Sequence, residues 1–335
     1  GFQPPHCPNP KCQFHKPHPH WHFVRFGHRL RQRDRRRIQN YRCRACGRFF
    51  CAAAFSTAYW LKRPDLLIPV AQLITEGAGI RQAARVLGVS PNTVARLVAR
   101  LGRHGMLFHH MQMHEATITQ PLVIDGFETF EYSQFFPFHL NWAVCSESWF
   151  LYHFTDSPLR RKGTMTKGQK KKRAELEAKV GRPDPKAVER GVAALLRPLL
   201  PRVRSSHLEL HSDDHPAYRR ALARLRRERA CEIRMVHRIT SSRQRRTQSN
   251  PLFPVNLADL LLRHGGANHK RETIAFSKRR RSAIERAALF LVWRNYIKRR
   301  REKDHPWGET AGMRAGVVDR PITWKQILKK RLFPS

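Results

Sequence analysis

The chain has 335 residues, and 65 Lys and Arg side chains against 25 Asp and Glu give it a formal net charge of +40 at pH 7. Such a charge repels itself unless a polyanion neutralises it, which disfavours cationic partners and favours nucleic acid. No apolar run reaches the roughly 18 residues of a membrane span. Seven clustered cysteines suit a reducing compartment and metal binding better than disulfides. We therefore expect a cytoplasmic, nucleoid-associated protein without a membrane partner.

The first segment, residues 1–60, is expected to be a small β domain built on a metal. Cys7 and Cys12 lie in the turn-rich sequence CPNPKC, and Cys43 and Cys46 lie in YRCRACGRFF, with two β-like stretches between them. Two such turns on paired strands are typical of a four-cysteine zinc ribbon. Zinc would be structural here, because four protein ligands leave no open coordination position. One nearby histidine could replace a cysteine, the candidates being His6, His15, His18, His20 and His22.

A helix-turn-helix is expected within residues 61–115. The sequence of residues 76–105 has two helical apolar patterns separated by Gly88, which permits a tight turn. Ser90 is placed to cap the second helix, with proline following at its first position. Polar groups on the exposed face of that helix suit the DNA major groove, and a helical hairpin without a DNA role is the alternative. The expected DNA-binding residues are Ser90, Asn92, Thr93, Arg96 and Arg100.

Two aspartates stand at the ends of apolar strands further along the chain. Asp125 follows the run in PLVIDGFETFE, and Asp213 follows SHLELHS. A carboxylate buried at a strand end is unfavourable unless it is paired, hydrogen-bonded or bound to metal. If the two strands are neighbours, both carboxylates converge and can hold Mg²⁺ or Mn²⁺ for phosphodiester chemistry. The competing interpretation is an exposed Asp213 beside an Asp214 that caps the next helix, and we expect Asp213 to bind metal and Asp214 to make the turn.

The remaining pattern is mixed α/β. Strands and helices alternate between residues 116 and 305, where a domain with a mixed sheet flanked by helices is expected. A basic stretch at about 157–185 interrupts this domain as a loop or helical hairpin, and residues 306–335 form a C-terminal tail.

These motifs together resemble an insertion-sequence transposase of the DDE type. The similarity covers nearly the whole chain, in the order YRCRACGRFF, GIRQAARVLGVSPNTVARL, IDGF, SDDHPAY and RETIAFSKR. It implies an RNase H-like catalytic domain after the zinc ribbon and the helix-turn-helix. It also implies metal-dependent cleavage and strand transfer at the ends of a mobile element, with Asp125 and Asp213 as the first two acids and Mg²⁺ or Mn²⁺ as cofactor.

The third acid departs from the family pattern. The family places a Glu on a helix after the last strand, often three residues before an Asn, and this chain has Asn256 and Asp259 at those two places. Residues three apart on a helix share a face, so Asp259 could reach the same metal. Glu272, Asn256 as a neutral ligand, and Glu285 are the alternatives.

Double-stranded DNA, as terminal inverted repeats and target DNA, is the partner that the resemblance implies. Joining two ends implies a homodimer or larger assembly. The atypical third position keeps open a transposase-derived, non-catalytic DNA-binding regulator. The basic surface keeps open an RNA-processing protein that binds without sequence readout.

Overall fold

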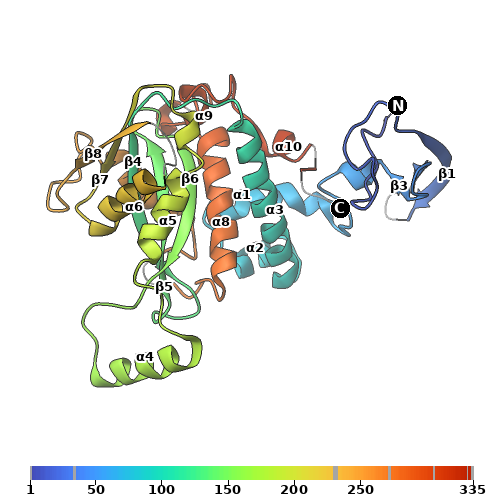
Figure 1. The fold of residues 1–335 in the computed structure, drawn as a ribbon. Helices are drawn as coiled ribbons and strands as arrows, with labels where there is room; N and C mark the ends of the chain where they lie inside the picture. The colour runs from blue at the N-terminus through green and yellow to red at the C-terminus, as the bar shows by residue number, and fades with distance from the viewer. Residues whose placement is uncertain are drawn as a thin grey trace. The chain divides into compact units, whose positions relative to one another are not determined.

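The computed structural model describes residues 2–32, 35–228, 233–270, 273–304, 306–329 and 331–332. These residues form two compact units, one of Gly1–Pro69 with Thr323–Ser335 and one of Val70–Ile322. Each unit is described separately below, and Figure 1 labels their elements.

The first unit is built on a three-stranded antiparallel sheet in the order β1-β2-β3. Its strands are β1 (Phe23–Arg31), β2 (Arg36–Cys43) and β3 (Phe49–Cys51). Trp21, Tyr41 and Phe50 are buried together with three of the cysteines. The chain's C-terminal segment packs here as well: α10 (Trp324–Ile327) is followed by Leu328, whose carbonyl accepts a 2.9 Å hydrogen bond from the Thr57 hydroxyl.

The second unit contains a five-stranded mixed sheet in the order β6-β5-β4-β7-β8. Within this unit, β4, β5 and β6 pair antiparallel. β7 and β8 then extend the sheet parallel to β4. The strands are β4 (Leu122–Phe130), β5 (Pro137–Cys145), β6 (Leu151–Pro158), β7 (His207–Ser212) and β8 (Arg234–Ile239).

Helices precede the sheet, cover it and follow it. Before the sheet come α1 (Leu67–Thr75), which crosses the boundary between the units, α2 (Ile80–Val86) and α3 (Pro91–Gln112). Within and after it come α4 (Lys167–Val180), α5 (Ala187–Leu196), α6 (Pro216–Arg227), α7 (Phe253–Gly265), α8 (Arg280–Val292) and α9 (Ala311–Arg314). A π-helical turn, Trp293–Ile297, extends α8.

The two faces of the sheet are covered by different helices. Paired residues on antiparallel strands share a face, so Asp125, which pairs with Trp142, lies on the Trp142 face. Phe290 of α8 contacts the Trp142 ring there, with ring centroids 6.2 Å apart. On the other face α5 comes so close that the Gly191 carbonyl accepts a 2.8 Å hydrogen bond from Thr155. Asp125 therefore lies on the α8 face.

The predicted helix-turn-helix segment and the sheet belong to the same compact unit. α3 continues for 22 residues and lies alongside α8 (Figure 1). Contact is closest at Gly102, where a Cβ atom would come within 2.4 Å of the Glu285 carbonyl oxygen. The packing of α3 is therefore shared between its pairing with α2 and its contact with α8.

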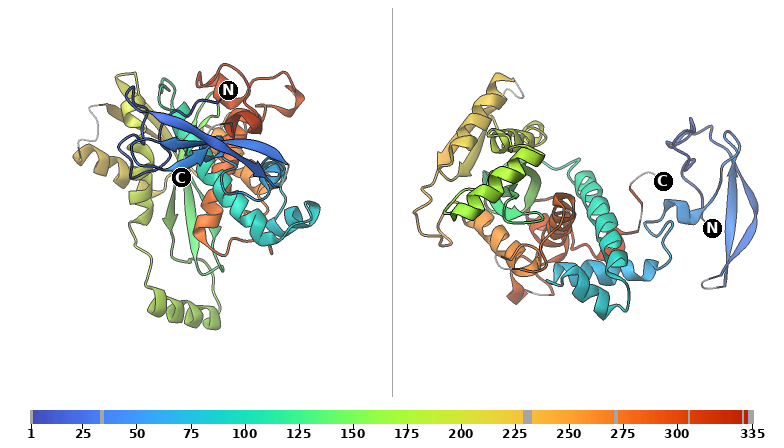
Figure 2. Two further views of the ribbon diagram at one scale, coloured as in Figure 1. Left: turned by 90° about the vertical axis from the view of Figure 1, so that its right-hand side faces the viewer. Right: turned by 90° about the horizontal axis from the view of Figure 1, so that it is seen from below.

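The predicted insertion forms a projecting helix. α4 buries none of its side chains, and it stands away from the sheet in Figures 1 and 2. Thr166 caps its first turn by accepting a 3.2 Å hydrogen bond from the backbone NH of Gln169. The stretch at about 157–185, expected as a loop or helical hairpin, contains this single helix.

The expected mixed α/β class is confirmed, with a small antiparallel sheet and a larger mixed sheet flanked by helices. The finer domain assignments, with boundaries at residues 60, 115 and 305, stay predictions.

Candidate functional site

Asp125 and Asp213 are brought side by side by neighbouring parallel strands. Leu122 of β4 pairs with Leu210 of β7, and Val123 pairs with His211. Two residues further on, the same register sets Asp125 beside Asp213, which lies directly after the end of β7. The expected convergence of the two carboxylates is therefore found.

Short hydrogen bonds fix one oxygen of each carboxylate. Asp125 Oδ1 accepts from the backbone NH of Gly126 at 2.7 Å and from the Tyr218 hydroxyl at 3.2 Å. Asp213 Oδ1 accepts from the backbone NH of His215 at 3.0 Å. Each of the two side chains is thus held by one of its oxygens.

Asp259 of α7 is the third carboxylate near this pair. Burial raises the pKa of Asp125 to about 6, opposed by the Gly126 hydrogen bond and reinforced by the negative charge of Asp213. Burial also raises the pKa of Asp259 well above its usual range, and the charge of Asp125 raises it further. Its Oδ1 atom is buried and accepts no hydrogen bond from the residues that the structure describes. An unpaired buried oxygen of this kind is unusual and suits a cation.

The alternative third ligands lie in different surroundings. Asn256 is half-buried one turn before Asp259 on α7. Glu285 accepts a 3.1 Å hydrogen bond from Arg281 and lies where α8 meets α3. Glu272 is outside the described residues.

The expected role of Asp214 is corrected. Asp214 is exposed, and Asp213 is the residue that accepts the hydrogen bond closing the turn, from the NH of His215. His215 is the N-cap of α6, since its Nδ1 accepts from the backbone NH of Ala217 at 3.2 Å. The sequence suggested the wrong partner because all three residues have capping side chains.

Three neighbours of the acids were not singled out in the sequence. The Tyr218 hydroxyl donates to Asp125, and Arg246 and Arg263 lower the pKa of Asp259 by their positive charge. Tyr218 lies five residues after Asp213 on the helix that starts at the strand end, and this spacing could have identified it. Neither arginine gave a comparable signal, since Arg246 lies in the arginine-rich run RQRR and Arg263 is a single arginine at the end of an apolar stretch.

The four predicted cysteines form a compact cluster in the first unit. One ligand atom from each of Cys7, Cys12, Cys43 and Cys46 lies within 4.8 Å of the others. The Cys7 and Cys46 sulfurs are 3.6 Å apart, and those of Cys12 and Cys43 are 4.0 Å apart. Sulfurs about 2.3 Å from a tetrahedral zinc are about 3.8 Å from one another. The cluster could therefore hold a metal such as zinc.

Hydrogen bonds from neighbouring side chains reach two of the four sulfurs. Asn9 Nδ2 donates to Cys46 at 3.5 Å and Trp21 Nε1 donates to Cys43 at 3.3 Å. Burial opposes ionisation of Cys46, but hydrogen bonds led by Asn9 outweigh it and lower the thiol pKa to about 7. His15 is hydrogen-bonded to the backbone and not to a sulfur of the cluster: its Nδ1 atom lies 3.0 Å from the Cys7 carbonyl oxygen. Among the described residues, the cysteine set is complete without a histidine, and it is the one group of three or more possible ligands this close together.

The α2–α3 pair has the turn chemistry that was expected. Gly88 adopts a φ of 62°, in the left-handed region, and Ser90 caps α3 by accepting from the NH of Thr93 at 3.2 Å. Asn92 and Arg96 are exposed, and Thr93 is half-buried. Arg100 is half-buried, and burial followed by the charge of Arg103 lowers its pKa. In the first three turns of α3, the buried side chains are those of Val94, Leu97, Val98 and Leu101.

No family model matches this chain, and no curated protein matches it in sequence. Within the described part of the chain, none of the helices combines the length and apolar character of a membrane crossing.

Proposed function

We propose that the chain is a metal-dependent DNA nuclease and strand transferase of the DDE type that acts at the ends of a mobile element. The single observation that carries the proposal is the placement of Asp125 and Asp213 in register on adjacent parallel strands, with Asp259 of α7 beside them. Clustered, partly buried carboxylates are unfavourable without a counter-charge, and oxygen donors of this kind suit Mg²⁺ or Mn²⁺.

The site's own residues prepare the three carboxylates. Tyr218 and the Gly126 NH hold Asp125 by Oδ1, and the His215 NH holds Asp213 by Oδ1. Asp125, Asp213 and Asp259 would hold the cation, and the Oδ1 atom of Asp259 accepts no hydrogen bond from the described residues. A divalent ion, when bound, activates water or a 3′-hydroxyl and stabilises the leaving oxygen of a phosphodiester.

DNA binding follows from charge and from the α2–α3 pair. The exposed Asn92 and Arg96 near the start of α3 are suited to base and phosphate contacts. The net charge of +40 supplies the attraction to the phosphate backbone. We take the terminal inverted repeats and target DNA as substrates, a dimer or larger assembly as the active form, an RNase H-like fold for the sheet domain, and a structural zinc ribbon for the four cysteines.

Nicking of supercoiled plasmid in Mn²⁺ or Mg²⁺ tests the proposal. Asp213→Asn should lose activity by on the order of 100-fold or more, because the neutral amide no longer balances the cation. Asp214→Asn is the matched control, since this neighbour is exposed, and it should retain activity. Equal nicking by the two variants, or none by the parent protein, would contradict the proposal.

The second candidate is a non-catalytic, transposase-derived DNA-binding regulator. It is favoured by Asn256, which stands where the resemblance places a catalytic Glu. Sequence-specific duplex binding that is weakened by Arg96→Ala, combined with no nicking by the parent protein, would support this function.

A further inference from the structure

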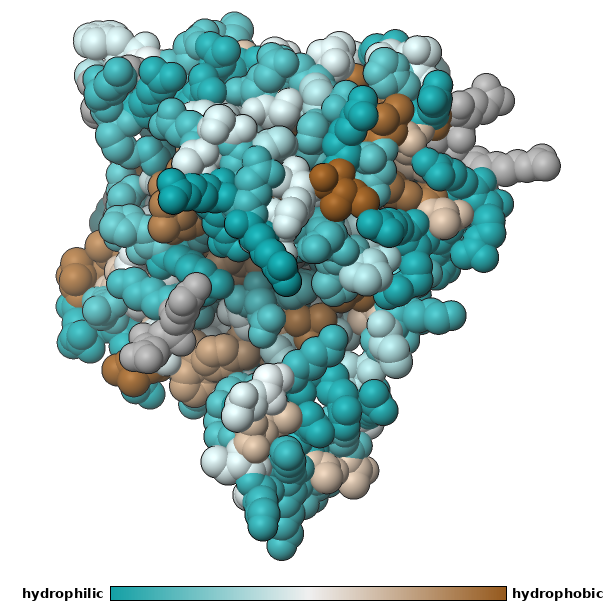
Figure 3. Space-filling model, turned by 90° about the vertical axis from the view of Figure 1, so that its left-hand side faces the viewer, coloured by the Kyte–Doolittle hydropathy of each residue, from teal (hydrophilic) through white to brown (hydrophobic). Residues whose placement is uncertain are grey.

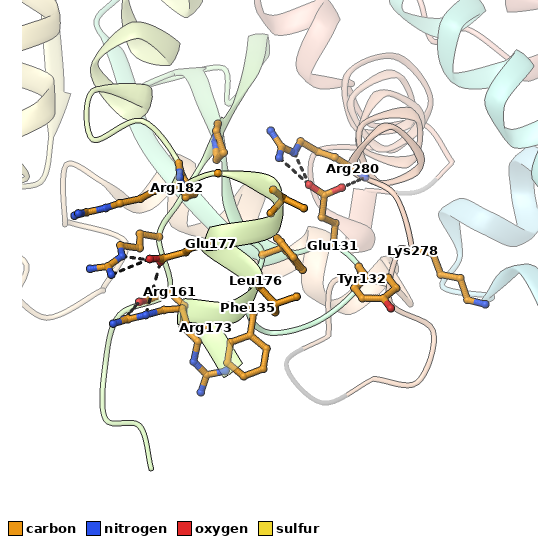
Figure 4. A pocket seen from close by; sticks show the side chains of 16 residues that line it. Glu131, Tyr132, Phe135, Arg161, Arg173, Leu176, Glu177, Arg182, Lys278 and Arg280 are labelled. Atoms are coloured by element: carbon orange, nitrogen blue, oxygen red, sulfur yellow. Dashed lines mark hydrogen bonds and ion pairs between the residues drawn. The ribbon is translucent and has the colours of Figure 1, made fainter. Parts of the chain in front are cut away.

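A groove of about 570 Å³ lies between the projecting helix and the sheet domain. Figure 4 shows its three walls: the turn after β4 with Tyr132 and Phe135, α4 with Leu176 and Glu177, and the start of α8 with Arg280. Pockets of a few hundred Å³ are large enough for a small molecule or a nucleotide. The groove lies outside the acid site, and the proposed chemistry does not use it.

The groove has an excess of positive charge. Six cationic side chains line it against two acidic ones. Arg160 and Arg173 both pair with Glu177, at 2.8 Å and 3.7 Å, and Glu131 is occupied by Arg280 at 2.7 Å. Arg161, Arg182 and Lys278 also line the groove and are outside these pairs. The Arg161 Nη1 atom is buried without a hydrogen-bond partner among the described residues. The groove is therefore suited to an anionic ligand.

Aromatic rings lie beside these cations. The Arg161 guanidinium carbon is 5.1 Å from the centre of the Phe135 ring. Tyr132 is 64% exposed and contacts Phe136, with ring centroids 6.1 Å apart. An exposed ring in a groove lined by arginines is a combination that can bind an unstacked base and its phosphate.

Tyr132 is held in a conformation that its own side chain disfavours. Its φ is 58°, in the left-handed region where bulky residues are outliers. The backbone fixes it there, because its NH donates a 2.8 Å hydrogen bond to the carbonyl of the buried Ser277. A glycine or asparagine would fit this turn with less strain, and an exposed ring adds little to the core. Strain of this kind gathers at functional sites.

We propose that this groove binds a nucleotide of single-stranded DNA, with the base on Tyr132 and the phosphate on Arg161. The proposal rests on the proposed function in one respect, that the strand is DNA. β4 connects the two regions: Asp125 is six residues before Glu131, about 20 Å along an extended strand. The groove would therefore hold a single strand that leaves the acid site a few nucleotides away.

Binding to two fluorescent DNA probes tests this, using the full chain at fixed salt in buffer without Mg²⁺ or Mn²⁺. One probe is a blunt duplex, and the other is the same duplex with a short single-stranded extension. The extension should raise the affinity about tenfold, the usual effect of one stacked base. Tyr132→Ala and Arg161→Gln should abolish this gain while still binding the blunt duplex, and Tyr132→Phe should keep it.

Arg204→Gln is the matched control for charge, since Arg204 is exposed and lies before β7, away from the groove residues. It should weaken both probes equally. The proposal is overturned if Arg161→Gln behaves like this control, if Tyr132→Ala keeps the gain, or if free deoxynucleoside monophosphate competes as well as the extended strand.

The Asp125→Asn variant separates this proposal from the nuclease proposal. It should lose nicking and keep the affinity gain from the extension, because binding is measured without divalent cation. A parent protein that gains affinity from the extension but does not nick would refute the nuclease and leave the groove assignment standing.

Discussion

At the scale of single residues, the chain has 25 carboxylates, and two of them, Asp125 and Asp213, stand in register on adjacent strands with Asp259 near Asp125. Asp125 and Asp213 each end an apolar run, and this signal in the sequence was sufficient to select them. The division of roles within the Asp213–Asp214 pair was not readable, because both are aspartates and either could close the turn. The path of the backbone decides it: Asp213 closes the turn and is also the residue in register with Asp125.

Asp125→Asn should stabilise the protein at neutral pH when no divalent cation is added. Its pKa is raised from 3.8 to about 6, so the folded state holds this proton more tightly than the unfolded chain does. Ionisation of Asp125 therefore lowers the free energy of unfolding. The effect is absent below about pH 3.8 and reaches about 2–3 kcal/mol above pH 6. Thermal unfolding of both proteins across this range should show the difference growing with pH. Parallel pH profiles would contradict the assignment of a buried, ionised carboxyl.

Metal-induced stabilisation should identify the third ligand. Binding of Mn²⁺ to the folded state raises the melting temperature, and loss of a ligand removes this rise. Asp259→Asn should lose most of the rise, whereas Asn256→Ala, one turn earlier on α7, should keep it. The opposite pattern would assign the role to Asn256.

At the scale of elements, one contact in each unit shows how the elements pack. In the first unit, the sheet and the cysteine cluster share one small core in which Trp21 contacts Cys43. In the second unit, α3 approaches α8 at Gly102 closely enough to exclude a Cβ atom. The cysteine spacing predicted the cluster but not its contact with Trp21, and the α3–α8 contact requires knowledge of which helix faces which.

Removal of the metal should unfold the first unit selectively. Structural zinc contributes about 10–16 kcal/mol to small folds of this kind. Cys43→Ser should lose zinc, measured by atomic absorption, together with hydrogen-exchange protection in β1 and β2. Cys51→Ser is the control, since Cys51 is buried and stands outside the cluster. Full zinc content in Cys43→Ser would contradict the four-cysteine site.

Gly102→Ala should destabilise the second unit by about 1–2 kcal/mol. The new methyl group would meet the Glu285 carbonyl oxygen at 2.4 Å, and overpacking outweighs the higher helix propensity of alanine. Gly168→Ala on α4 has open space and should instead stabilise that helix, by up to about 1 kcal/mol. Denaturant unfolding followed by circular dichroism compares the two variants, and a stabilised Gly102→Ala would refute the close contact.

At the scale of the whole molecule, the excess of positive charge is the dominant property. The face shown in Figure 3 is largely hydrophilic, with small and separate hydrophobic patches. If the chain binds nucleic acid as proposed, its net charge of +40 would supply most of the affinity through counterion release. That attraction would not be specific, so we propose that selectivity comes from sites such as the α2–α3 pair or the groove beside α4.

Duplex DNA binding should therefore depend steeply on salt. Contacts to about 6–10 phosphates would lower the affinity by about 10³–10⁵ between roughly 50 and 200 mM salt. Fluorescence anisotropy against KCl concentration measures the slope, and Arg96→Ala should reduce its magnitude by about one. A nearly flat dependence would contradict an electrostatic interface. Tighter binding to duplex RNA at equal salt would favour the RNA-processing alternative.

The sequence by itself determined the features that are local along the chain: the cysteine spacing, the Ser90 cap, the alternation of strands and helices, and the two strand-end aspartates. Each depends on neighbours within a few residues, so spacing and residue type suffice to predict it. Only the tertiary structure decided that β4 pairs with β7, which sets Asp125 beside Asp213. It also decided that α7 carries Asp259 close to Asp125 and that Tyr132 and Arg161 line one groove. These arrangements depend on contacts between distant segments, which a single sequence does not specify in a readable way.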